Sequence, residues 1–181
     1  MMMHIDVSSV LRQTVSCELY SNLVTRPTGA AVRTQIEALL ADSRERSLTV
    51  IDFSCADEVI AKLLLRYASA ERTDREAYFL FRGVTDDHWD AIETVLERHS
   101  LALVLETDDG ARVVGMVDDG ERVAWEKVYE LGRTGPADLA SALGGQESDA
   151  EAVLDALHRR RLVMRTDEGY IAVGGIGIRH D

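Results

Sequence analysis

A serine, a cysteine and three carboxylates lie close together after one apolar segment. They belong to the stretch "VIDFSCADEVIAKLL" and are Asp52, Ser54, Cys55, Asp57 and Glu58. A hydroxyl or thiol at the start of a helix can act as a nucleophile, because the N–H dipoles stabilise negative charge. Paired carboxylates can transfer protons, and a serine in such a turn can accept a phosphoryl group. A catalytic site, a phosphate loop, a helix cap and a phosphorylation site are therefore open interpretations.

The neighbouring residues argue against catalysis. A cysteine-type phosphatase needs an arginine six residues after its cysteine, and that position is Ala61. A nucleophile elbow needs the GxSxG pattern, and a phosphate loop needs several glycines and a lysine. We therefore expect a protein that is not an enzyme and has no catalytic residue, with Cys55 as a small buried side chain. Carboxylates such as Asp57 and Glu58 also favour the first turn of a helix without any catalytic role.

Ser54 stands where the N-cap of the following helix is expected. Asp57, three residues later, approximates the acid of a capping box. Losing such a cap costs about 1 kcal/mol. A capping serine is partly exposed, so the same hydroxyl could also carry a phosphoryl group.

Composition and charge restrict the classes of partner. The 181 residues include 32 acidic and 20 basic ones, which gives a net charge of −12 and a sequence pI near 4.8. Such a surface repels polyanions, so nucleic acid and anionic membranes are poor partners. The histidines at positions 4, 88, 99, 158 and 180 are far apart and carry no HExxH or CxxC companion, so no metal and no other cofactor is expected.

The same composition predicts a cytoplasmic protein. The two cysteines, Cys17 and Cys55, cannot form a disulfide framework, which fits a reducing compartment. The start, "MMMHIDVSS", lacks the charged and apolar parts of a secretion signal. No segment approaches the roughly 20 apolar residues of a membrane span.

Strands and helices alternate in the first two thirds of the chain, which predicts the α/β class: a sandwich of a mixed sheet and helices. The predicted strands are 4–7, 14–20, 48–53, 77–84 and a hairpin over 101–117, which turns at Asp108-Asp109-Gly110. The predicted helices are 30–42, 56–67 and 86–99, the first of them preceded by a break at 25–29.

The last third has a different pattern. A polar joint at 118–121 precedes predicted helices at 121–131, 136–145 and 147–161 and a hairpin at 162–173. Three helices and a hairpin predict a winged helix-turn-helix. We therefore expect two domains, 1–118 and 119–181.

"VIDFS" followed at once by "CADEVIAKLL" resembles the STAS domain of anti-sigma factor antagonists. It is still more similar to a STAS-like family with a "DF…ADE" motif, which is found near histidine-kinase-type ATPase domains. Asp52-Phe53 matches "DF", and Ala56-Asp57-Glu58 matches "ADE". Arg26 and Gly29 match that family's Arg-x-x-Gly before its first helix. The match covers about residues 14–100, and this chain departs from the pattern in having only Ser54 and Cys55 between the two motifs.

The resemblance implies a partner-switching regulator. A protein partner, a kinase or an anti-sigma-type ATPase, would bind the domain, and phosphorylation at the turn would break the complex. Ser54 would be the phosphorylated residue. The partner surface would include the residues that carry or flank the motifs: Arg26, Gly29, Asp52, Cys55, Asp57 and Glu58.

A winged helix first suggests DNA binding. The alternative function is therefore a DNA-binding transcription regulator with the STAS-like part as its sensor. The third helix, however, begins with Glu147, Asp149 and Glu151, and its basic cluster Arg159–Arg161 comes last. From Gly120 onward there are 8 basic and 11 acidic residues, a net of −3. Arg133, Arg165 and Arg179 could together form a basic patch that contacts DNA. We nevertheless expect this part to contact a protein or a second copy of this chain rather than DNA.

Overall fold

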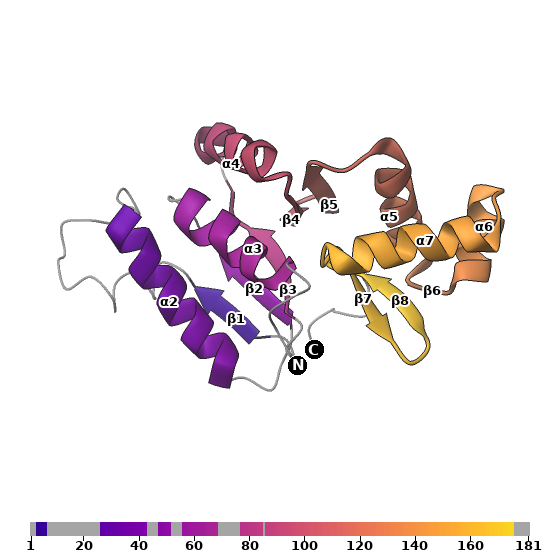
Figure 1. The fold of residues 1–181 in the computed structure, drawn as a ribbon, viewed down its shortest axis with the longest axis horizontal. Helices are drawn as coiled ribbons and strands as arrows, with labels where there is room; N and C mark the ends of the chain where they lie inside the picture. Colours follow the sequence, from indigo (N-terminus) through magenta and orange to yellow (C-terminus); the bar gives the residue numbers. More distant parts are fainter. Residues whose placement is uncertain are drawn as a thin grey trace.

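The computed structural model describes residues 3–6, 26–42, 47–51, 56–68, 77–84 and 86–175 (Figure 1). The first part contains β1 (Met3–Asp6), α2 (Arg26–Asp42), β2 (Ser47–Ile51), the π-helix η1 (Ala56–Ala61), α3 (Lys62–Ala68), β3 (Tyr78–Arg82), α4 (Asp86–His99), β4 (Ala102–Thr107) and β5 (Gly110–Gly115). The second part contains α5 (Asp119–Leu131), β6 (Arg133–Thr134), α6 (Pro136–Leu143), α7 (Glu147–Arg159), β7 (Val163–Thr166) and β8 (Gly169–Ala172). The predicted α/β class is confirmed, whereas the strand predicted at 14–20 lies outside the described residues.

The first sheet is mixed, and its strands follow the order of the chain. Its order is β1-β2-β3-β4-β5, with β1 to β4 parallel and β5 antiparallel to β4. The predicted hairpin at 101–117 forms its last two strands, with Val104 opposite Val113. When parallel strands lie side by side in chain order and each crossover is right-handed, all the connecting helices fall on one face. The other face of such a sheet is left open.

One face of the first sheet is packed against the helices α2, η1, α3 and α4, and together they form one hydrophobic core. Alternate residues of the strands point into it, as the period of two requires. Phe79 and Phe81 of β3 and Leu103 of β4 meet Ile36 of α2 and Leu96 of α4, and all five are at most 3 % exposed.

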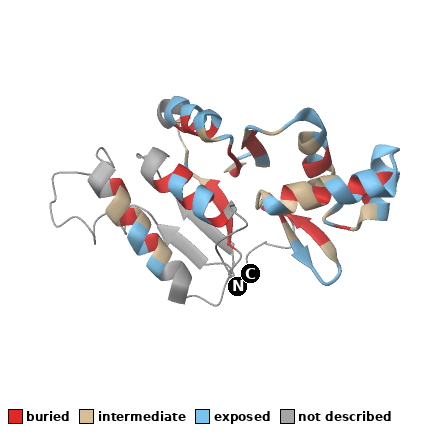
Figure 2. Cartoon of the chain, in the orientation of Figure 1, coloured by how far each residue is buried: buried red, intermediate tan, exposed pale blue. Residues whose placement is uncertain are grey.

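The C-terminal helices cover the opposite face. Tyr78 and Leu80 of β3 and Val104 of β4 belong to the same hydrophobic core as Trp125 of α5 and Leu154 of α7. Figure 2 shows buried residues continuing from the strands into α5, α7 and β8. The predicted boundary between residues 118 and 119 therefore separates two segments that share a core.

The C-terminal part combines α5, α6 and α7 with an antiparallel sheet of order β6-β8-β7. The three helices and the hairpin are at the predicted places. The polar joint predicted at 118–121 is wrong, because Asp118 is the N-cap of α5. Its Oδ1 accepts from the N–H of Glu121 at 2.7 Å, and the Glu121 carboxylate accepts from the N–H of Asp118 at 3.4 Å. Asp118 and Glu121 of this acidic segment therefore form a capping box.

Two other segments differ from the expected pattern. The break predicted at 25–29 is wrong for its last four residues, because α2 already begins at Arg26. Proline suits a first helical turn, whose N–H groups have no partner within the helix, so Pro27 lies in the first turn of α2 instead of preceding the helix. The helix predicted at 56–67 is present, but its first six residues form the wider π-helix η1.

Candidate functional site

The starts of three helical segments lie at one edge of the sheet, the edge where the parallel strands end. We call this edge the carboxyl edge. Short connections join α2 to the start of β2 and α4 to the start of β4, so both helices run against the strands and begin at the carboxyl edge. In Figure 1, α2 and the segment formed by η1 and α3 both run opposite to the strand arrows. In parallel sheets this edge is where binding sites form.

Most of the predicted site residues belong to the carboxyl edge or to its connections. Arg26 is the first residue of α2, and Asp57 and Glu58 lie in the first turn of η1. Ser54 lies outside the described residues, in a connection that joins Ile51 of β2 to Ala56 of η1. Asp52 and Cys55 belong to that same undescribed connection.

Gly29 is placed differently from the others. It lies within α2, three residues after Arg26, and it is buried. A glycine there lets the helix backbone approach its neighbours closely, because it has no side chain. Direct contact of Gly29 with a partner stays a prediction.

The π-helix η1 follows the Ser54 connection directly. Such helices are rare and occur frequently at functional sites. Val59, Ile60 and Ala61 are each 0 % exposed, so the π-helix is anchored in the core by three consecutive side chains. The backbone that follows the Ser54 connection is therefore held in one position.

Ion pairs hold elements of the first part together, one of them at the carboxyl edge. The guanidinium of Arg82, the last residue of β3, pairs with the Glu106 carboxylate on the neighbouring strand β4. Farther from that edge, Glu37 of α2 forms one ion pair with Arg33 of the same helix at 3.7 Å and another with Arg66 near the end of α3. The carboxyl edge therefore combines the Arg82–Glu106 pair with the positive ends of three helices.

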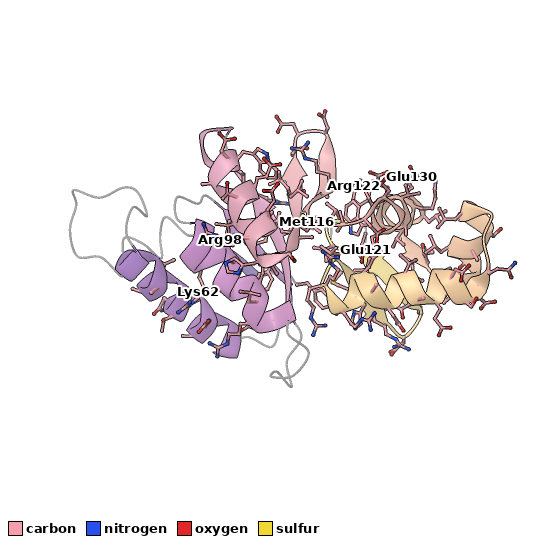
Figure 3. The ribbon with its side chains drawn as sticks, turned by 45° about the horizontal axis from the view of Figure 1, so that its top comes forward. Lys62, Arg98, Met116, Glu121, Arg122 and Glu130 are labelled. Carbon is pink, nitrogen blue, oxygen red and sulfur yellow. The ribbon has the colours of Figure 1, made fainter. Side chains whose placement is uncertain are left out.

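The basic cluster at the end of α7 is largely used inside the molecule. Arg160 pairs with Glu121 at 2.8 Å and also donates to the carbonyl oxygen of Met116. Arg161 donates from Nε to the carbonyl oxygen of Tyr67 at 3.2 Å, and its guanidinium lies 5.6 Å from the ring centre of Tyr78. Figure 3 shows Met116, Glu121 and Arg122 close together where the sheet meets the C-terminal part.

An aromatic and polar network joins α7 to both sheets. Nδ1 of His158 lies 3.3 Å from the Tyr78 hydroxyl and 3.3 Å from the carbonyl oxygen of Val163. The Tyr170 hydroxyl donates to Asp155 at 2.9 Å. Burial raises the pKa of Tyr170, and the hydrogen bond to Asp155 adds to the effect, so this hydroxyl keeps its proton at neutral pH. The sequence pattern alone did not predict this network, because its residues come from distant segments.

Two further findings concern the described residues only. No three histidine, cysteine, aspartate or glutamate side chains among them are grouped so that they could hold a metal ion. No helix in this part of the chain is long and apolar enough to cross a membrane.

No protein-family model, curated protein or solved structure matches the chain.

Proposed function

We propose that the chain is a non-enzymatic regulatory protein that binds a protein partner at the carboxyl edge and releases it when Ser54 is phosphorylated. One observation carries the proposal: the topology brings the start of α2, with Arg26, and the start of η1, with Asp57 and Glu58, to the same edge. The partner class is the one that the STAS-like resemblance implies, a kinase or an anti-sigma-type ATPase.

The charges suit a switch of this kind. Phosphorylation adds about −1.5 to −2 charges at neutral pH. On Ser54 this charge would stand within four residues of Asp52, Asp57 and Glu58. A partner surface that matches the unmodified turn would then face excess negative charge, and unfavourable charges at an interface cost several kcal/mol. Release would require no unfolding of η1.

The order of elements in the C-terminal part favours the alternative function. A helix, a short strand, two helices and a hairpin follow one another as in a winged helix, a fold that often binds DNA. The charges argue against this use. Glu147, Asp149 and Glu151 are exposed at the start of α7, whereas Arg160 and Arg161 are engaged with the rest of the molecule.

Two of the three arginines in the predicted basic patch also contact other residues of this chain. Arg133 pairs with Glu168, and the Arg165 guanidinium lies 5.8 Å from the ring centre of Tyr170. Arg179 lies outside the described residues. We therefore propose protein contact rather than DNA contact for this part.

The full chain should not bind random duplex DNA at physiological salt. Phosphate contacts supply most non-specific affinity, and the exposed start of α7 is acidic. An electrophoretic mobility shift assay over a range of salt concentrations measures this. A micromolar shift that weakens as salt rises would instead support the DNA-binding alternative.

Arg26→Ala should weaken partner binding by about tenfold, the effect of losing one charge-assisted hydrogen bond. The melting temperature should stay nearly unchanged, because Arg26 is the first residue of α2 and its amide needs no partner within the helix. Titration calorimetry and thermal unfolding measure the two effects. Arg98→Ala, at an exposed position in the last turn of α4 and away from the carboxyl edge, is the matched control and should bind like the wild type. Loss of folding in Arg26→Ala would show that this arginine is structural.

Affinity capture from an extract of the native host tests the class of function. With the full chain as bait, the proposal predicts recovery of a kinase or a sigma-factor regulator. Recovery of a specific DNA fragment would favour the alternative, and recovery of neither would contradict both.

A further inference from the structure

A pocket of about 340 Å³ lies at the edge of the sheet opposite to the carboxyl edge. Four segments form it: the end of α3, the start of β3, the link from α4 into β4, and the end of α7. Its lining residues are Leu64, Leu65, Tyr67, Phe79, Ser100, Leu101, Ala102, Arg159, Arg160 and Arg161. The volume falls at the lower end of the range of small-molecule sites, about 300–1,000 Å³.

The lining combines apolar walls with a cationic rim. Tyr67, Phe79, Leu101 and Ala102 are each at most 8 % exposed and form apolar walls. The polar groups of the lining side chains are the hydroxyls of Tyr67 and Ser100 and the guanidinium groups of the three consecutive arginines. A pocket that is mostly apolar, with a few polar groups on one side, is the usual form of a site for an amphipathic ligand.

Arg159 is the arginine available to a ligand. Arg160 pairs with Glu121, and Arg161 donates to the Tyr67 carbonyl and lies over the Tyr78 ring. Arg159 is exposed, and within the described part of the chain no carboxylate forms an ion pair with it. A guanidinium binds a carboxylate through two parallel hydrogen bonds, which gives both strength and orientation.

The backbone around the pocket is unusual. Ser100 has φ +52° and Arg161 has φ +62°, and they are the non-glycine residues with positive φ in the described chain. Both follow helix ends, where glycine is the favoured residue. A side chain in this conformation costs about 1 kcal/mol. Both residues line the pocket, so the two strained positions belong to its wall.

We propose that this pocket binds a small organic acid with an aliphatic or aromatic body. Its apolar body lies against Tyr67, Phe79 and Leu101, and its carboxylate pairs with Arg159. The site is independent of the proposed partner-binding function. It does, however, lie at the far end of the helical segment that begins with η1 at the carboxyl edge.

Octanoate is a suitable probe, with octylammonium as a ligand of equal length and opposite charge. Titration calorimetry with the full chain should show saturable, single-site binding of octanoate at millimolar concentrations and none of octylammonium. Arg159→Gln should weaken octanoate binding by about tenfold, whereas Arg165→Gln, which removes the same charge from β7, should leave it unchanged. Leu65→Asp, at a position that is 38 % exposed, should fold and lose octanoate binding by placing a carboxylate in the lining.

Several results would overturn the proposal. These are the absence of saturable octanoate binding, equal binding of octylammonium, or unchanged binding by Arg159→Gln. Circular dichroism of each variant checks that it is folded. If Leu65→Asp fails to fold, the comparison of Arg159→Gln with Arg165→Gln still decides the question.

Discussion

Trp125→Ala should lower the free energy of unfolding of the whole chain by about 3–5 kcal/mol, the cost of truncating a large core side chain. Trp125 is 1 % exposed, its indole N–H donates to the carbonyl oxygen of Leu162 at 2.9 Å, and its ring stacks on Tyr129. It lies in the core that Tyr78, Leu80 and other residues of the main sheet share with the C-terminal part. Because the core is shared, the loss should destabilise both parts together.

The chain itself supplies the reporter for this experiment. It has two tryptophans, and in Trp125→Ala the remaining one is Trp89, which packs against the core on the opposite face of the sheet. Denaturant unfolding followed by Trp89 fluorescence and by circular dichroism should give one shifted, coincident transition. Leu131→Ala, on the same helix but 48 % exposed, is the control and should change stability by less than about 1 kcal/mol. An unshifted Trp89 transition beside a separate, earlier loss of circular dichroism would show two independent domains.

The sequence was informative where a local pattern determines the structure. Phe79 and Phe81 alternate with Tyr78 and Leu80, and this unbroken apolar run indicated a strand covered on both faces. The helix at 86–99 has the predicted bounds, because its apolar stripe is regular.

The errors arose where similar residues suit two structures. Acids at 118–121 suit a solvated joint as well as a helix cap, and only the following turn distinguishes the two. Pro27 suits a break as well as a first helical turn. In both cases the predicted loop belongs to a helix start.

The long-range contacts could not be predicted from the sequence. No local signal connects Arg161 with Tyr67, which lies 94 residues earlier, or assigns the C-terminal helices to the open face of the sheet. From the sequence alone, the basic cluster Arg159–Arg161 is only the last part of the third predicted helix. The pocket that it rims is formed by four separate segments and could not be predicted.

Ser54→Asp should reduce partner binding by at least about 100-fold, because an unfavourable charge at an interface costs several kcal/mol. The added carboxylate imitates part of a phosphoryl group and joins Asp52, Asp57 and Glu58. Aspartate is as good an N-cap as serine, so the variant should fold normally. Ser54→Ala should keep partner binding while losing about 1 kcal/mol of stability through the lost cap.

The most direct test is titration calorimetry of the captured partner against the wild type, Ser54→Ala and Ser54→Asp, with thermal unfolding of each variant. We expect wild type and Ser54→Ala to bind alike and Ser54→Asp, although as stable as the wild type, to show no measurable binding. Equal affinity of Ser54→Asp and Ser54→Ala would contradict the account, because Ser54 would then be a helix cap without a role in partner release.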